Sequence, residues 1–153
     1  MTARLELTST PKFAKGFIAA HLALADSTVP RITLELMNIR ASQINGCGAC
    51  LDMHTKEAAH AGETPLRINL VGAWRETTVF SDAERAALEL TEQGTRLADT
   101  SGVSDEAWAE AARYYNEEQL TILVGQISLI NAFNRLNVIL KQAGGDYAVG
   151  HVG

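Results

Sequence analysis

The stretch ELMNIRASQINGCGACLDMH, residues 35–54, decides how this 153-residue chain is interpreted. Its middle, Asn45-Gly46, is a turn signal that separates two segments long enough to form helices. We therefore expect one helix over 30–45, a reversal of the chain, and a second helix over 47–61. The cysteines Cys47 and Cys50 then fall where the second helix begins.

The signals outside this stretch are helical as well. Thr10-Pro11 and Thr64-Pro65 each predict an N-cap followed by a proline at the first helical position, and Ser81 with Glu84 matches a capping box. Strand-like alternation is absent, and no linker or repeat divides the chain. We expect a single all-α domain over 1–153, with further helices near 11–25, 65–75, 82–98, 105–114 and 117–143.

The last of these helices, which ends before Gly144-Gly145, is apolar on more than one side. A buried core helix is the first interpretation, and an oligomer contact is the alternative.

Composition narrows the class of protein. The 13 basic and 18 acidic residues give a net charge of −5, which argues against nucleic-acid binding. Two cysteines are too few for a disulfide-rich secreted scaffold, and the first residues lack the pattern of a signal peptide. The most apolar early stretch, 17–25, is far shorter than the roughly 20 residues that a membrane span needs. We expect a cytoplasmic protein with no membrane association.

The cysteine pair is the main chemical signal. At a helix N-terminus, unpaired backbone N–H groups lower the pKa of a thiol below its free value of about 8.5. His54 lies four residues after Cys50 and seven after Cys47, so all three share one helical face. An imidazole beside a thiol can take its proton. The spacing to His54 favours Cys50 as the attacking cysteine, whereas the position nearest the helix start favours Cys47.

Glu35 is placed near His54 by the geometry of the expected hairpin. At 1.5 Å per residue, Glu35 lies about 15 Å from the turn and His54 about 11 Å along the returning helix. The two side chains can therefore meet. A carboxylate on the far nitrogen of an imidazole fixes its tautomer and raises its basicity.

Other interpretations of these residues remain open at this point. Cys47, Cys50 and His54, with Glu35 or His60, have the residue types of a zinc site. The pair can also form a disulfide as a redox sensor or exchange protein without turning over a substrate, or lie inert in the core.

The remaining histidines and the apolar residues nearby are weaker candidates. His60 lies on nearly the same face as Cys50, although a surface position near the helix end is the first expectation. His21 is expected to be structural or exposed, and His151 lies in the tail. Five apolar residues close to the cysteines in the sequence are candidates for the wall of a thiol pocket: Leu36, Ile39, Ile44, Leu51 and Met53.

Glu, eleven residues, Cys-x-x-Cys, three residues and His, as they stand from Glu35 to His54, resemble the core motif of the alkylhydroperoxidase AhpD-like, or carboxymuconolactone decarboxylase, family. The context Arg40-Ala-Ser-Gln-Ile-Asn-Gly-Cys and an Asn134-Arg135 pair in the last expected helix are also similar to that family. Because the decarboxylase branch generally lacks the cysteine pair, the resemblance points to the redox branch.

This resemblance implies a helical fold that assembles into trimers or hexamers and a thiol peroxidase activity without a cofactor or metal. It implies that Cys50 is the peroxidatic cysteine, Cys47 the resolving one, His54 the base and Glu35 the proton relay behind it. The substrate would be a hydroperoxide and the reductant an external dithiol, which in the family can be a lipoyl-bearing protein. One departure is Ala49, which stands where well-studied peroxidase members have a histidine.

Overall fold

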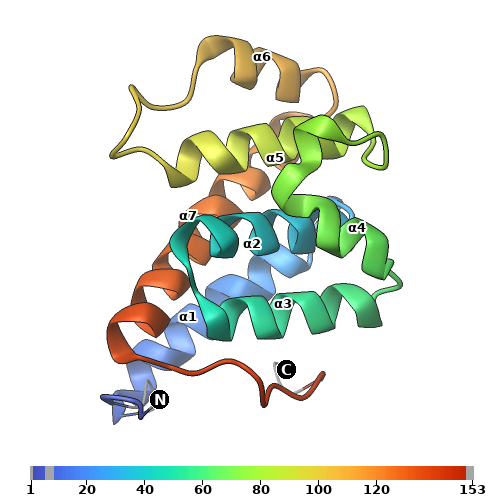
Figure 1. Ribbon diagram of the computed structural model, residues 1–153. Coiled ribbons are helices and arrows are strands. Elements are labelled where there is room, and N and C mark those ends of the chain that lie inside the picture. Colours follow the sequence, from blue (N-terminus) through green and yellow to red (C-terminus); the bar gives the residue numbers. More distant parts are fainter. Residues whose placement is uncertain (1, 6–8, 151–153) are drawn as a thin grey trace.

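The expected hairpin lies at the centre of the structure, a computed structural model that describes residues 2–5 and 9–150 (Figure 1). Its two helices are α2 (Arg31–Asn45) and α3 (Gly48–His60). Gly46 adopts the left-handed conformation, with φ of 67°, and its N–H bonds to the carbonyl of Ser42. Glycine takes this conformation without steric cost, so the chain reverses here and α3 starts two residues later.

All-α architecture is confirmed, because no strand occurs over 2–5 and 9–150. Thr64, Ser81 and Asn116 cap their helices with side-chain bonds to the backbone, whereas Thr10 caps by position alone. The remaining elements in chain order are α1 (Pro11–Ala25), α4 (Pro65–Leu70), the 3₁₀ helix η2 (Val71–Glu76), α5 (Asp82–Thr95), α6 (Asp105–Ala112) and α7 (Glu117–Leu140).

Three of the expected helices are divided or end three residues early, and the helix over 105–114 ends two residues early, at Ala112. The single helix over 65–75 is divided, because α4 gives way to η2 and Ala73 has a non-helical φ of −119°. The helix over 82–98 ends at Thr95. The last helix stops at Leu140 instead of 143, because Lys141 turns left-handed with φ of 57°. Non-glycine residues rarely adopt that conformation, so the sequence gives little signal for this ending.

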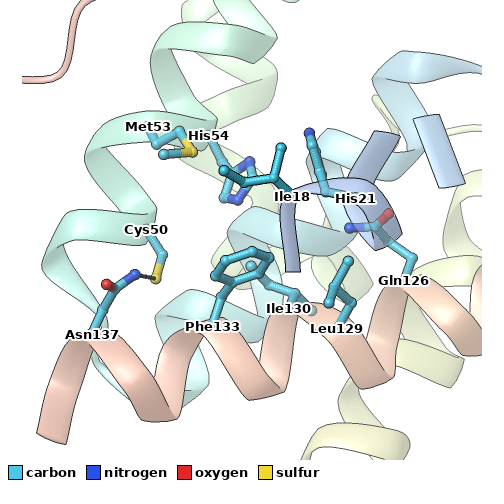
Figure 2. Close-up of a pocket in the computed structure, with 10 residues that line it drawn as sticks. All are labelled: Ile18, His21, Cys50, Met53, His54, Gln126, Leu129, Ile130, Phe133 and Asn137. Carbon is cyan, nitrogen blue, oxygen red and sulfur yellow. Dashed lines mark hydrogen bonds between the residues drawn. The ribbon is translucent and has the colours of Figure 1, made fainter. Parts of the chain in front are cut away.

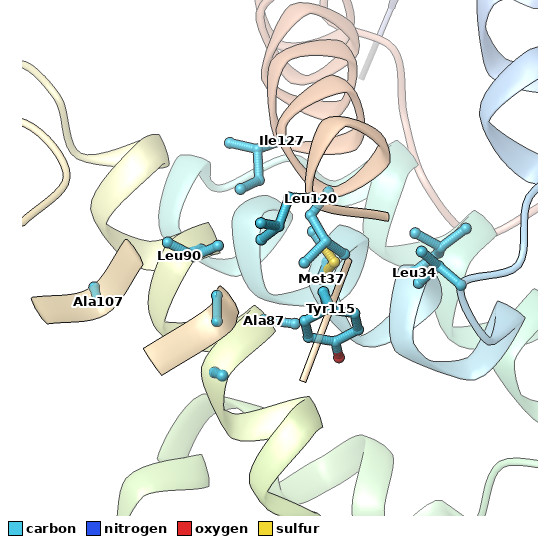
Figure 3. Close-up of a cluster of buried hydrophobic side chains, with 12 residues drawn as sticks. Leu34, Met37, Ala87, Leu90, Ala107, Tyr115, Leu120 and Ile127 are labelled. Carbon is cyan, nitrogen blue, oxygen red and sulfur yellow. The ribbon is translucent and has the colours of Figure 1, made fainter. Parts of the chain in front are cut away.

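Helix α2 joins the two halves of the core. One cluster of buried side chains fills the space between α2, α5, α6 and α7 and includes Met37, Leu90 and Leu123 (Figure 3). The other lies between α2, α3, η2 and α5 and includes Ile39 and Leu88. Burying both faces of α2 fixes the helix that carries Glu35.

Helix α7 is buried along one face, as expected for a core helix, and its other face is exposed. Its length and apolar composition would also suit a membrane span, yet it packs against α1, α2, α3, α5 and α6. Its buried face includes the amides of Gln126, Asn131 and Asn134, and Asn45 donates hydrogen bonds to both Asn131 and Asn134. These amide contacts tie α7 to the end of α2 beside the turn.

The segment after α7 runs back along α3, as the red tail in Figure 1 shows. Asp52 accepts hydrogen bonds from the backbone N–H groups of Gly145 and Tyr147, at 2.6 and 2.9 Å. A hydrogen bond from Lys56, together with these two, lowers the pKa of Asp52 to about 2. Gly144 packs so closely on α3 that an added Cβ would lie 2.3 Å from the carbonyl oxygen of Gly48. The tail therefore holds the end of α7 against the start of α3.

Candidate active site

The two cysteines lie at the start of α3 and are joined as a disulfide, with a Cα–Cα distance of 5.3 Å. Cys47 is the N-cap residue, and its Sγ accepts a hydrogen bond from the backbone N–H of Cys50 at 3.3 Å. Cys47 is 1% and Cys50 3% exposed. The pair is therefore buried at the positive end of a helix, where thiolates are stabilised.

Glu35 and His54 meet across the hairpin, as the helix geometry predicts. Glu35 Oε2 lies 2.8 Å from His54 Nδ1, and both side chains are buried. A carboxylate at this distance accepts the Nδ1–H proton, which leaves Nε2 as the basic nitrogen. The pair therefore holds the imidazole in the tautomer that a general base needs.

Two buried amides that the sequence analysis did not single out lie behind this pair. Gln126 donates to Asn38 Oδ1 at 2.5 Å, and Asn38 Nδ2 lies 3.3 Å from His54 Nδ1. Because Nδ1–H of His54 is donated to Glu35, the Asn38 amide packs beside the ring without bonding to it, and Gln126 of α7 holds Asn38 of α2 in place. Polar residues inside an apolar helix are the only sequence signal for them.

Asn137, in the last turn of α7, is another site residue that sequence reasoning missed. Its Nδ2 donates to Cys50 Sγ at 3.3 Å (Figure 2). The two residues lie 87 positions apart, so only the packing of α7 on α3 brings them together.

A cavity of about 210 Å³ opens on Cys50 (Figure 2). His54 and His21 contribute imidazoles to its wall, and Cys47 does not line it. The other lining residues are largely apolar and come from α1, α3 and α7: Ile18, Met53, Gln126, Leu129, Ile130, Phe133 and Asn137. The cavity therefore presents one of the two sulfurs to an apolar ligand.

A second cavity, of about 260 Å³, lies on the Glu35 side of His54 and is more polar. Arg31, Glu57 and Tyr147 line it together with Glu35. His54 lines both cavities, so its ring lies between the sulfur and a polar space that can exchange protons with water.

His21, which was expected to be structural or exposed, is partly buried and lines both cavities from α1. Burial lowers the pKa of His21, and the nearby imidazole of His54 lowers it further. Only the way α1 packs over the site reveals this position, since the sequence around His21 carries no motif.

His60 and most of the apolar candidates lie elsewhere. His60 is exposed at the end of α3, as expected, and lines neither cavity. His151 lies outside the described residues. Among the five apolar candidates only Met53 lines the Cys50 cavity. Leu36 and Ile39 belong to the second core cluster, and Leu51 packs against it.

The geometry around the cysteines favours thiol redox chemistry over a zinc site. The two sulfurs are bonded to each other, and the Nδ1 of His54 is occupied by Glu35. Over residues 2–5 and 9–150, no group of three or more His, Cys, Asp or Glu side chains is arranged to hold a metal ion.

Comparison with known sequences gives one family. A sequence model of the carboxymuconolactone decarboxylase family matches residues 11–93, which include the hairpin and both cysteines. The uncharacterized protein YdfG of Bacillus subtilis (strain 168) is 44% identical over 114 residues, 74% of this chain and 77% of its own length.

Comparison with solved structures gives the same fold. A protein of unknown function from Agrobacterium tumefaciens, provisionally described as the antioxidant defence protein AhpD, superposes with a TM-score of 0.90. It is 30% identical, and the match covers 95% of this chain and all of that one. The debrominase Bmp8 in complex with 2,3,4-tribromopyrrole shares the fold, with a TM-score of 0.81 at 20% identity over 92% of this chain and 74% of its own.

Proposed function

The chain belongs to the carboxymuconolactone decarboxylase family, and on that premise we propose that it is a thiol peroxidase that reduces organic hydroperoxides. The observation that carries the proposal is the opening of Cys50, and not Cys47, into an apolar cavity that it shares with the Glu35-paired His54. The cycle that follows uses only side chains of this chain, the peroxide and an external dithiol.

The first step oxidises Cys50. His54 Nε2 accepts the thiol proton, and the thiolate attacks one oxygen of the hydroperoxide, which breaks the O–O bond. The alkoxide that leaves takes the proton back from the imidazolium and departs as the alcohol, while Cys50 becomes a sulfenic acid. Glu35 stabilises the imidazolium throughout, because its carboxylate is bonded to Nδ1.

The second step forms the disulfide. Cys47 gives up its proton and attacks as a thiolate at the sulfur of the Cys50 sulfenic acid; the S–S bond forms, the S–O bond breaks, and the hydroxyl leaves with that proton as water. The helix N-terminus and the N–H of Cys50 stabilise the Cys47 thiolate that attacks. Summed over both steps, one hydroperoxide and two thiols give one alcohol, one water and one disulfide.

An external dithiol then restores the thiols. The disulfide is almost fully buried and is reached through a cavity of about 210 Å³, so the reductant must present its thiols on a slender arm. A dihydrolipoyl group on a carrier protein has that shape. Attack on Cys50 from the cavity releases Cys47 as a thiolate at the helix N-terminus, where a thiolate leaves most readily.

We also propose that the chain works as a cytoplasmic trimer or hexamer. An apolar groove follows α1 and α7 and shares Leu129 with the Cys50 cavity, and Ile18 and Leu22 of α1 are 42% and 45% exposed. Exposed apolar surface of this kind favours burial against a second copy. The groove is lined by Ala20, Ala23, Leu24, Ile122, Gly125, Ser128, Leu129 and Ala132.

A steady-state assay tests the enzymatic proposal. Purified protein is supplied with cumene or tert-butyl hydroperoxide and, in turn, dihydrolipoamide, thioredoxin or glutathione as donor. We expect many turnovers with dihydrolipoamide and none for Cys50→Ser. Consumption of one peroxide per chain with every donor would instead support a redox sensor, which is the second candidate because Ala49 replaces a histidine between the cysteines.

A further inference from the structure

Asn137 is a polar contact to the reacting sulfur that the cycle above does not use. Its Nδ2–H points at Cys50 Sγ from the last turn of α7 (Figure 2). Cys47 has a different donor, the backbone N–H of Cys50. Each sulfur therefore has one N–H group, but only that of Cys50 comes from a side chain on another helix.

Hydrogen bonds hold the end of α7, which carries Asn137, in place beside α3. The backbone carbonyl of Asn137 accepts a hydrogen bond from the backbone N–H of Gln142 at 2.9 Å, which closes the end of α7. The tail that follows is bound by Asp52, two residues after Cys50 on α3. Because the tail joins the end of α7 to the helix that carries the sulfur, these hydrogen bonds hold the backbone of Asn137 beside α3.

We propose that Asn137 stabilises the thiolate of Cys50 and so sets its reactivity. An N–H donor favours the charged form of the group that accepts it, and a thiolate is a far better acceptor than a thiol. The proton that Cys50 loses passes to His54, and the amide holds the negative sulfur that remains. This proposal rests on the proposed function only in taking Cys50 as the attacking cysteine.

The other groups that face Cys50 are few. His54 from α3 and His21 from α1 share its cavity, and Glu35 from α2 faces it through His54. The residues that α7 contributes to the cavity carry no charge. Removing the amide of Asn137 therefore changes the sulfur's surroundings without removing a titrating neighbour.

Alkylation of the reduced protein tests the proposal. In a Cys47→Ser background, the rate of iodoacetamide addition to Cys50 is followed against pH by mass spectrometry. Asn137→Leu is of similar size but has no donor. It is expected to raise the midpoint pH of the alkylation curve of Cys50 by about 1 pH unit and to slow alkylation about tenfold at neutral pH. Asn137→Asp is expected to raise it further, because a carboxylate repels the thiolate.

The matched control is Ile139→Ala, two residues further along α7 and 62% exposed, which is expected to leave the midpoint unchanged. Circular dichroism shows which variants are folded, and Asn137→Asp, equal in size, serves if the leucine variant is not. A midpoint equal to that of the parent in either folded variant would overturn the proposal. Because the assay uses neither peroxide nor donor, an inactive enzyme would refute the proposed function and leave this result standing.

Discussion

Two buried glutamates in this molecule differ in what surrounds them. Glu35 and Glu92 are each 7% exposed. Glu92 accepts hydrogen bonds from the guanidinium groups of Arg40 and Arg75 and from the indole N–H of Trp74. Glu35 has one strong partner, the imidazole of His54, and lines a cavity. Permanent cations hold Glu92 ionised, whereas the partner of Glu35 can gain or lose a proton.

The difference separates a structural carboxylate from the one that we propose to be part of the proton relay. Burial raises the pKa of Glu92, but the bonds from Arg75, Trp74 and Arg40 outweigh it and hold that pKa below its ordinary value. A group so fixed binds α2, η2 and α5 together and takes no part in proton transfer. Glu35 is buried equally deeply, so burial does not distinguish the two carboxylates, whereas the kind of partner does.

Glu35→Gln is the substitution expected to have the largest effect. A neutral amide cannot stabilise the imidazolium of His54, so peroxide turnover should fall by about 100-fold, within the range of general acid–base contributions. The stability of the fold should change little, because glutamine fills the same volume. Steady-state kinetics and thermal unfolding of the same preparation measure both quantities. Turnover equal to that of the parent would remove Glu35 from the mechanism.

Glu92→Gln should show the reverse pattern. It leaves Arg40 without its carboxylate and half-exposed Arg75 with that of Glu89 alone, which should cost about 2–3 kcal/mol of unfolding free energy, somewhat less than for a fully buried pair. Urea unfolding measures the loss, and the turnover of the folded fraction should match that of the parent. If this variant lost turnover as severely as Glu35→Gln while remaining folded, the contrast between the two carboxylates would fail.

Glu92→Gln should also change how the unfolding free energy depends on pH, which is a smaller effect. Because folding lowers the pKa of Glu92, its contribution to stability is complete above the unfolded pKa of about 4.5 and is lost as pH falls through the lower folded value. The parent should therefore lose more unfolding free energy than Glu92→Gln between pH 5 and acid conditions of roughly pH 3. Equal losses in the two proteins would show that folding does not lower the pKa of Glu92.

The chain's own sequence reveals the part of the site that depends on local geometry. The Asn45-Gly46 turn and a fixed rise per residue are enough to bring Glu35 to His54. Asn137 and His21 are not accessible in this way, because their positions depend on how α7 and α1 pack against α3. The end of α7 was missed for a related reason, since a lysine takes the left-handed conformation there.

The most direct test of the proposed mechanism is to identify the cysteine that the peroxide oxidises first. Cys47→Ser and Cys50→Ser proteins are reduced, treated with one equivalent of cumene hydroperoxide in the presence of dimedone, and examined by peptide mass spectrometry. We expect a dimedone adduct on Cys50 in the Cys47→Ser protein and almost none on Cys47 in the Cys50→Ser protein. An adduct that forms only on Cys47 would contradict it.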